Sequence, residues 1–331
     1  MRSISVKNKL LLAVSIVFAF GLGWFSAAFF YAKLYQENLS QEPSSVRSSY
    51  FSDRIPEEFV LFTMPKTGTH FMRPFLEHLT GQNSVSYWSK EITFPKNYIY
   101  DKKMLSQLML LPEVVQPYWL NQPIHKNTFI SVLDDLLTNN DFIVTHAPFS
   151  VEMENTLKQR DCMVFFLIRD PRDWIVSVIK HPAISGVDIF GQPMGDRTFL
   201  ALDNNQKIDY ILNGTATYYS VLETMNMFLA WKKSPISCAL RFEALLGPRG
   251  GTYSETEQLA ELRKIADALY IDISDEELLS IFDESFGVGT VFSKGKAGTW
   301  KDYFNEEHKT RFKELMGDML IELGYEQDYN W

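Results

Sequence analysis

A lysine, a glycine and two threonines lie where an apolar run gives way to a helical pattern. Residues 59–64 have the length and composition of a buried parallel strand, and residues 65–68 interrupt it. Beyond them, apolar residues recur at helical spacing from Phe71 to Leu79. A helix N-terminus presents unpaired N–H groups and a partial positive charge, to which Lys66 adds a full charge and Gly68 adds close access to the backbone. The segment therefore predicts a cradle for an anion such as phosphate.

The hydroxyl groups of Thr67 and Thr69 would add hydrogen-bond donors to this cradle. The segment is not a Walker A loop, because GxxxxGK[ST] is absent and Lys66 precedes the glycine. An ordinary turn between a strand and a helix, with a solvated lysine, would show the same pattern. This segment alone therefore leaves both interpretations open.

Two further apolar runs end in residues that could act on such an anion. Residues 141–145 form a short predicted strand before His146, and residues 162–168 form a longer one before Arg169. The carboxyl ends of parallel strands border the crevice in which open α/β sheets bind ligands. Ser177 follows Arg169 by eight residues, so both could bind one anion. A structural role for His146 and a surface ion pair for Arg169 are the alternatives.

The order of the elements defines the fold that must position these residues. Asp170 suits a helix N-cap and Pro171 the first helical position. Strands that alternate with helices predict an α/β fold, a parallel sheet with helices on both faces. The other predicted elements are a strand over 236–242 and helices over 216–233, 255–269, 275–282 and 305–323, with irregular structure over 81–140 and loops over 247–251 and 292–300.

Composition excludes several classes of function. The chain has 331 residues, a net charge of −9 and a pI of about 5.3, which argues against nucleic acid as a partner. Cys162 and Cys238 lie in apolar runs, so we expect buried free thiols. Two cysteines are too few for a disulfide framework or a cysteine zinc site. The sequence also lacks HExxH, so we expect no catalytic metal.

A long apolar segment precedes the predicted catalytic region. Residues 10–32 carry no charge and are long enough to span a bilayer as a signal anchor. The basic residues of the 1–9 tail favour a cytoplasmic N-terminus and a translocated body, which predicts a single-pass protein of a Golgi-type membrane in a eukaryote or the inner membrane in a bacterium. Residues 33–57 are polar and predict a stem, and 58–331 form the folded domain.

Four segments together resemble the PAPS-dependent sulfotransferases, in particular their cytosolic-type branch (PAPS is 3′-phosphoadenosine 5′-phosphosulfate). The resemblance covers roughly residues 58–325. The matching segments are PKTGTHF (65–71) with the family's PKSGTTW, THAP (145–148) with THLP, the Arg169–Ser177 pair with the family's Arg and Ser, and KGKAGTWK (294–301) with KGxxGDWK.

The resemblance implies a P-loop-like three-layer α/β/α fold and PAPS as the donor, without a metal. It implies that His146 is the general base and that Lys66 stabilises the transferring group. The residues it implies for donor binding are Lys66, Thr67, Gly68, Thr69, His70 and Phe71 on the 5′ side, Arg169, Ser177, Lys294 and Gly295 at the 3′-phosphate, and Phe71, Phe242 and Phe286 near adenine.

The chain departs from the family pattern at four positions in or directly before these segments. Phe71 stands where the family has Trp, and His70 replaces a Thr. Val144 and Ser293 replace a Lys and an Arg, so two cations are missing. These losses leave open a catalytically inactive, membrane-tethered nucleotide-binding module. A P-loop-type nucleotide kinase is a further alternative, but it would need a Walker lysine and a magnesium-binding acid.

The predicted acceptor is a hydroxyl or amine on a small molecule, a glycan or a lipid. Its pocket would be walled by residues 81–140 and 186–215, which carry no motif that names the acceptor. The expected membrane contact is the N-terminal helix. The sequence leaves a homodimer open.

Overall fold

The computed structural model describes the folded region in several segments. They are residues 58–86, 114–115, 124–139, 142–180, 199, 201–213, 221–287 and 296–331, and all belong to a unit that spans Arg47–Trp331. The predicted tail (1–9), anchor (10–32) and stem (33–57) lie outside the described residues. Within the described segments, no helix has both the length and the apolar character needed to cross a bilayer.

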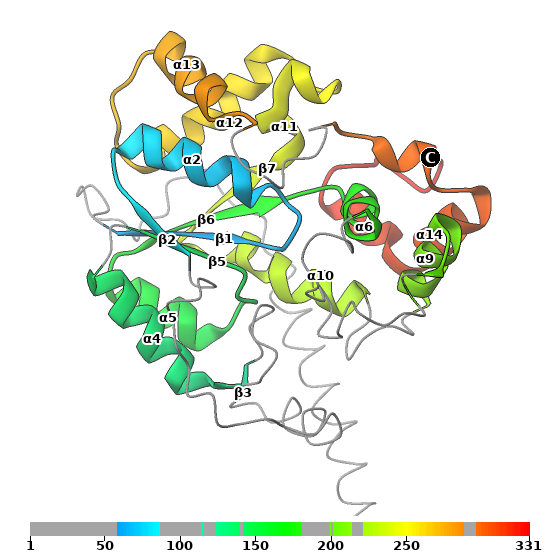
Figure 1. Cartoon of the computed structure of the whole chain (residues 1–331), viewed down its shortest axis with the longest axis horizontal. Coiled ribbons are helices and arrows are strands. Elements are labelled where there is room, and N and C mark those ends of the chain that lie inside the picture. The colour runs from blue at the N-terminus through cyan, green and yellow to red at the C-terminus, as the bar shows by residue number, and fades with distance from the viewer. Residues whose placement is uncertain are drawn as a thin grey trace, which may run out of the picture. The chain divides into compact units, whose positions relative to one another are not determined.

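The described residues include one five-stranded parallel sheet (Figure 1). Its order is β2–β5–β1–β6–β7, so β1 lies at the centre, between β5 and β6. The strand bounds are β1 Phe59–Thr63, β2 Ser84–Ser86, β5 Phe142–Thr145, β6 Met163–Ile168 and β7 Ser237–Arg241. A short antiparallel ribbon pairs β3 (Val114–Val115) with β4 (Ile124–His125). The predicted parallel sheet is confirmed.

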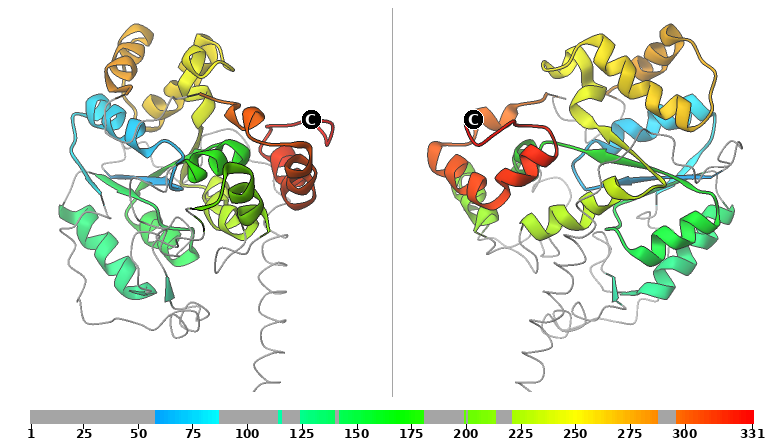
Figure 2. Two further views of the ribbon diagram at one scale, coloured as in Figure 1. Left: turned by 45° about the vertical axis from the view of Figure 1, so that its right-hand side comes forward. Right: turned by 180° about the vertical axis from the view of Figure 1, so that it is seen from behind.

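Alternate residues of the central strand β1 pack into two separate hydrophobic cores, one on each face of the sheet. Val60 and Phe62 belong to one core, with α4, α5, α6, α9, α10 and α14, whereas Phe59 and Leu61 belong to the other, with α2, α11, α12 and α13. Both faces of the sheet are therefore covered, as parallel sheets require (Figure 2). The helix bounds are α2 Thr69–Thr80, α4 Lys126–Asn139, α5 Val151–Gln159, α6 Pro171–Ile179, α9 Asn204–Leu212, α10 Val221–Leu229, α11 Phe242–Leu246, α12 Glu255–Ala268, α13 Asp275–Ser285 and α14 Glu306–Glu322.

Side-chain caps explain where several of these helices begin. Ser254, Ser274 and Asn305 each form a capping box with the third residue of the helix that follows. Asp170 accepts from the N–H of Arg172, so the predicted cap of α6 is confirmed. Each such cap satisfies an N–H group that the helix itself leaves without a partner.

The structure corrects three sequence predictions. The segment 81–140 is not irregular throughout, because α4 occupies Lys126–Asn139, and the predicted loop 247–251 contains the 3₁₀ helix η2, Gly247–Gly250. The helix predicted over 216–233 is α10 followed by the 3₁₀ helix η1, Ala230–Lys233, and residues 216–220 lie outside the description. Helices α5 and α9 were not predicted. Cys162 and Cys238 are buried free thiols, as expected.

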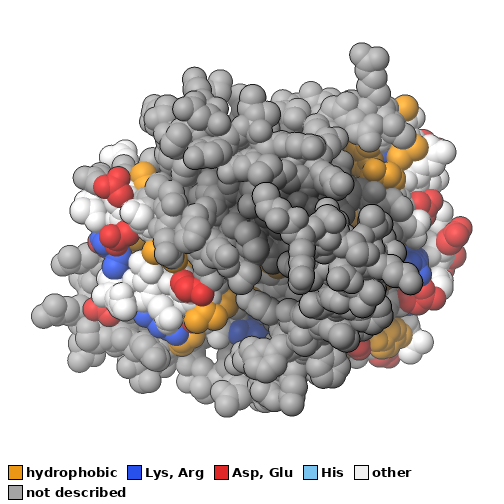
Figure 3. Space-filling view, turned by 90° about the horizontal axis from the view of Figure 1, so that it is seen from below, with side chains coloured by type: hydrophobic (Ala, Val, Ile, Leu, Met, Phe, Trp, Pro, Cys, Tyr) orange, Lys and Arg blue, Asp and Glu red, His pale blue; other side chains and the backbone are white. Residues whose placement is uncertain are grey.

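Seen from below, the described surface carries acidic and basic side chains interspersed with each other (Figure 3). Exposed pairs such as Lys309–Glu306, 2.6 Å apart, belong to this kind of surface. Exposed ion pairs usually contribute little to stability.

Candidate active site

The candidate site is built on the loop that joins β1 to α2. The main-chain oxygens of residues 64–66 all accept hydrogen bonds from the protein: Thr67 Oγ1 donates to the first (2.6 Å), Trp174 Nε1 to the second (2.7 Å) and Arg169 Nη1 to the third (2.6 Å). The loop therefore turns its carbonyls toward the protein. Lys66 (φ 71°) and Gly68 (φ 111°) have positive φ angles, a geometry in which successive N–H groups can surround an anion.

Gly68 is required at this loop for lack of space as well as for its φ angle. A Cβ atom at this position would lie 2.5 Å from the ring of Phe242. Gly68 is also the N-cap of α2, whose first N–H groups have no carbonyl partner within the helix. The partial positive charge of that helix end attracts an anion, and these N–H groups can bind it. The geometry therefore fits the predicted anion cradle.

The threonine hydroxyls of the cradle are engaged by the protein itself. Thr67 is fully buried and its hydroxyl donates to Met64 O over 2.6 Å, whereas the sequence predicts this hydroxyl as a donor to the anion. Thr69 Oγ1 lies 2.6 Å from Thr63 Oγ1. The Thr67 hydroxyl thus closes the loop on itself, and that of Thr69 joins the start of α2 to the end of β1. The N–H groups and Lys66 remain as the principal groups for an anion.

His146 follows β5 directly and meets the end of β1. Phe62 pairs with Thr145 in the sheet, which places the next residues, Thr63 and His146, side by side. His146 Nδ1 lies 2.7 Å from Thr63 O and 3.0 Å from Thr63 Oγ1. A carbonyl only accepts, so Nδ1 carries the proton and the lone pair of the neutral ring is on Nε2. Burial lowers the pKa of His146 to about 4, which keeps the ring neutral.

Two cationic residues lie at the anion loop, Lys66 within it and Arg169 in contact with it. Lys66 is partly buried, and burial together with the charge of Arg169 lowers the pKa of Lys66 to about 8. The guanidinium of Arg169 lies 4.8 Å from the centre of the Phe242 ring, and its Nε is buried with no hydrogen-bond partner among the described residues. A buried donor of this kind is costly unless a ligand or water satisfies it. Arg169 thus fits a bound anion.

The predicted adenine-side residues form one aromatic cluster. The Phe71 ring lies 5.9 Å from Phe242 and 6.5 Å from Phe286, centre to centre. Phe71 and Phe242 are almost fully buried, whereas Phe286 is partly exposed. Of the three, Phe286 therefore offers the most accessible ring. His70, also predicted on the donor side, is exposed at the first turn of α2.

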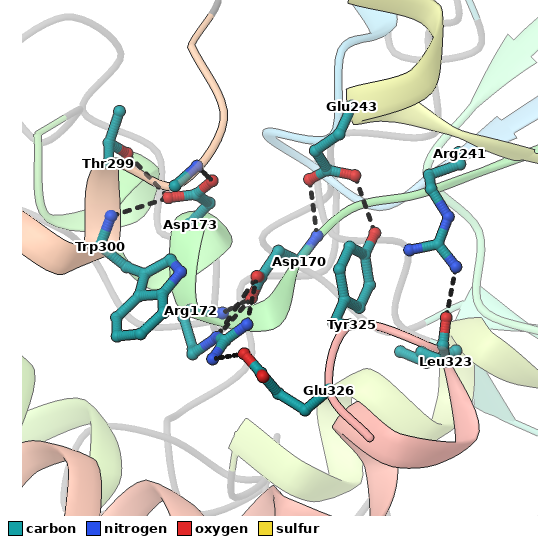
Figure 4. Close-up of polar contacts among 11 residues, drawn as sticks. Asp170, Arg172, Asp173, Arg241, Glu243, Thr299, Trp300, Leu323, Tyr325 and Glu326 are labelled. Atoms are coloured by element: carbon teal, nitrogen blue, oxygen red, sulfur yellow. Dashed lines mark hydrogen bonds and ion pairs between the residues drawn. The ribbon is translucent and has the colours of Figure 1, made fainter. Parts of the chain in front are cut away.

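The predicted 3′-phosphate residues fall partly outside the description. Ser177 is partly buried on α6, and Lys294 and Gly295 lie outside the described residues. The chain directly after them is attached to α6 through Asp173 (Figure 4). The Asp173 carboxylate accepts from Gly298 N (2.6 Å), Thr299 Oγ1 (2.8 Å) and Trp300 N (2.8 Å). The segment therefore returns to the helix that carries Ser177.

Sequence reasoning missed the residues that hold this site in place. Thr63 fixes the tautomer of His146, and Trp174 holds a carbonyl of the anion loop. Arg169 was predicted as a donor-binding residue, but its hydrogen bond to Lys66 O was not. The place of Thr63 at the carboxyl end of β1 was a usable signal. Main-chain acceptors, in contrast, carry no sequence signature. Within the described part of the chain, no group of three or more His, Cys, Asp or Glu residues could hold a metal.

Fold and site together define an α/β protein with a candidate anion-binding loop at the carboxyl edge of its parallel sheet. The sulfotransferase domain model matches residues 56–324, so this chain belongs to the sulfotransferase domain family. Similar solved structures include mouse sulfotransferase SULT7A1 complexed with PAP (18% identity, 80% of this chain and 84% of that chain, TM-score 0.49). Another is retinol dehydratase in a complex with retinol and PAP (17% identity, 83% and 84%, TM-score 0.49). No curated protein matches the sequence.

Proposed function

We propose that this protein transfers a sulfuryl group from PAPS to a hydroxyl or amine acceptor. The observation that carries the proposal is the pairing of an oriented neutral histidine with an anion cradle: His146 and Lys66 stand at the carboxyl ends of adjacent strands, and Thr63 holds the ring of His146. Family membership supports the reaction class. The donor, the acceptor class and the roles of individual residues are the proposal.

The donor's two anionic ends match two parts of the site. The 5′-phosphosulfate would lie against Lys66, Gly68 and the first N–H groups of α2. The 3′-phosphate would bind Arg169, whose buried Nε lacks a partner among the described residues, together with Ser177. A guanidinium offers a rigid fork of donors that suits phosphate oxygens. Both ends are thus supplied with charge by this chain.

In the transfer step, His146 Nε2 takes the proton of the acceptor while the acceptor oxygen or nitrogen bonds to sulfur. The bond between sulfur and the bridging oxygen breaks, and its electron pair leaves on the 5′-phosphate of 3′,5′-adenosine bisphosphate. Charge spreads over the sulfuryl oxygens and the bridging oxygen, where Lys66 stabilises it, as in phosphoryl transfer. The protein's part is positioning and electrostatics.

Two measurements on the full-length chain in detergent test this function. Calorimetry should show tighter binding of 3′,5′-adenosine bisphosphate than of 5′-AMP or ATP, because only the first has a 3′-phosphate. Labelled PAPS should then transfer its sulfuryl group to at least one member of a panel of phenols, alcohols, amines and sugars. Tighter binding of ATP would overturn the donor. Bisphosphate binding without any transfer would favour the inactive nucleotide-binding module.

The proposal includes a membrane anchor at residues 10–32, with a cytoplasmic N-terminus and the catalytic domain translocated. Its support is the uncharged apolar run and the basic residues that precede it. Protease protection in intact microsomes tests this orientation. Digestion of the domain from the cytosolic side would contradict it.

A further inference from the structure

The carboxyl-terminal tail, residues 323–331, contacts residues at the end of β7, in α11 and in α6 (Figure 4). Tyr325 donates its hydroxyl proton to Glu243 Oε2 over 2.8 Å, and Arg241 donates to the main-chain oxygen of Leu323. The guanidinium of Arg241 also lies 4.3 Å from the centre of the Tyr325 ring. The tail is thereby attached to the segment that joins β7 to α11.

A second set of contacts attaches the tail to α6. Arg172 donates from Nη1 to Glu326 over 2.5 Å and from Nη2 to Asp170 over 2.8 Å. Its guanidinium also lies 4.0 Å from the centre of the Trp300 ring and 4.4 Å from that of Trp331. Arg172 is 2% exposed, so these are contacts of a buried cation. The tail therefore packs as part of the fold beside the candidate site.

One buried carboxylate connects the tail to the residue that we place at the 3′-phosphate. Glu243 Oε1 accepts from the N–H of Asp170 over 2.8 Å, while Oε2 accepts from Tyr325. The N–H of Asp170 belongs to the peptide group that leaves Arg169. Glu243 therefore fixes the plane of that peptide group, from which Arg169 extends toward the anion loop.

We propose that Tyr325 and Glu243 are positioning residues for Arg169, through which the tail sets the affinity of the site for the donor's 3′-phosphate. This inference rests on the proposed function. Neither residue is assigned contact with the donor. Their effect passes through the peptide group between Arg169 and Asp170.

The charges around Glu243 make the hydroxyl of Tyr325 important to this arrangement. Burial raises the pKa of Glu243 to about 7, and the nearby carboxylate of Asp170 is the second cause of this rise. Burial also raises the pKa of Tyr325 well above its ordinary value, so its phenol stays protonated and can donate. Glu243 is 3% exposed, so solvent cannot easily replace a lost donor. Removal of the hydroxyl should let the carboxylate move.

The test is a matched pair of Tyr→Phe substitutions in the tail. Tyr325→Phe removes the hydroxyl that bonds Glu243, whereas Tyr329→Phe removes an exposed hydroxyl that bonds Asp318 Oδ1 over 2.7 Å. Each variant of the full-length chain is titrated with 3′,5′-adenosine bisphosphate and with 5′-AMP. Tyr325→Phe should reduce the preference for the bisphosphate about three- to tenfold, the worth of roughly one hydrogen bond. Tyr329→Phe should leave the preference unchanged.

A second substitution separates positioning from general stability and covers the case in which Tyr325→Phe does not fold. Glu243→Gln keeps a carbonyl oxygen for the N–H of Asp170 and should keep most of the preference, whereas Glu243→Ala should lose it. Equal losses for both nucleotides, or an unchanged preference in Tyr325→Phe and Glu243→Ala, would overturn the inference. If the wild type itself shows no preference for the bisphosphate, the proposed donor fails first, and this inference fails with it.

Discussion

His146 Nδ1 donates its proton to the main-chain oxygen of Thr63 over 2.7 Å. This contact joins the ends of two adjacent strands, so the sheet itself orients the ring. It also decides the tautomer, because a carbonyl cannot donate in return. A neutral histidine with its lone pair on Nε2 is the form that a general base requires.

We therefore expect His146→Ala to lower kcat by about 10²–10⁴-fold, the usual contribution of a positioned acid–base group. Binding of 3′,5′-adenosine bisphosphate should change little, which calorimetry checks. His70→Ala is the comparison variant, because His70 is a second histidine near the anion loop, at the exposed start of α2. Near-normal turnover in His146→Ala combined with a loss in His70→Ala would mean that His70, and not His146, is the general base.

The pH profile of kcat/KM should have limbs set by two residues. His146 is the neutral base above its pKa of about 4, so activity should fall as the pH drops through that value. Lys66 loses its charge as the pH rises through its pKa of about 8, so activity should fall there too. Lys66→Arg should move the alkaline limb upward, because guanidinium stays charged. The assay uses an alcohol acceptor, because an alcohol does not ionise in this pH range. An acid limb near pH 6.5 would contradict the burial that lowers the pKa of His146.

The sequence predicted β1, β5 and β6 well because these strands are buried on both faces, whereas β2 lies in the segment predicted to be irregular. Runs such as 59–64 and 162–168 are almost wholly apolar, and the observed strands β1 and β6 end within one residue of them. Helix α5 was missed because only one narrow stripe of it is buried, around Met153 and Leu157. Its acidic first turn after Ser150 was a usable start signal.

The candidate site was predictable only in its side chains. The loop at 65–69, His146 and Arg169 stand out by residue type and by their places at strand ends. The contacts that orient them involve main-chain atoms, such as Thr63 O and Lys66 O, which every residue type possesses. The hydroxyl of Thr67 donates to Met64 O because the local turn brings that carbonyl to within 2.6 Å. Such contacts follow from backbone conformation, which residue types do not specify.

Arg169→Ala should weaken 3′,5′-adenosine bisphosphate binding by roughly ten- to a hundredfold, since a charge-assisted hydrogen bond contributes roughly 1.5–3 kcal/mol. Arg169 also donates to Lys66 O, so 5′-AMP should lose some affinity as well, but much less. Calorimetry of both nucleotides on wild type and variant forms a double cycle. Arg311→Ala, an exposed arginine on α14, is the control. Equal losses for the two nucleotides would mean that Arg169 only supports the loop.

Asp173→Asn should destabilise the fold by about 1–3 kcal/mol, because an amide cannot accept from all the donors that the carboxylate now satisfies, and a buried donor is left without a partner. Urea unfolding followed by tryptophan fluorescence measures the loss. Asp302→Asn is the control, because Asp302 is an exposed residue of the 3₁₀ helix that contains Thr299 and Trp300 (η3, Thr299–Asp302). It should change stability by less than about 0.5 kcal/mol. Similar effects of the two substitutions would contradict the role of Asp173.

Gly68→Ala should cost more stability than Gly81→Ala, although both glycines have positive φ angles. At Gly81 nothing lies within 4 Å of an added Cβ, so only the backbone strain of about 1 kcal/mol applies. At Gly68 the Cβ would lie 2.5 Å from the ring of Phe242, and overpacking of this kind typically costs roughly a further 1–3 kcal/mol.

The same collision should disturb the anion loop, so Gly68→Ala should also weaken bisphosphate binding at least about tenfold, whereas Gly81→Ala should not. The double variant Gly68→Ala, Phe242→Ala isolates the cause, because removal of the ring removes the collision. Its loss of stability in urea should be smaller than the sum of the two single losses, by more than about 0.5 kcal/mol. Additive losses would mean that the strained backbone, and not the contact with Phe242, is the reason that glycine stands at position 68.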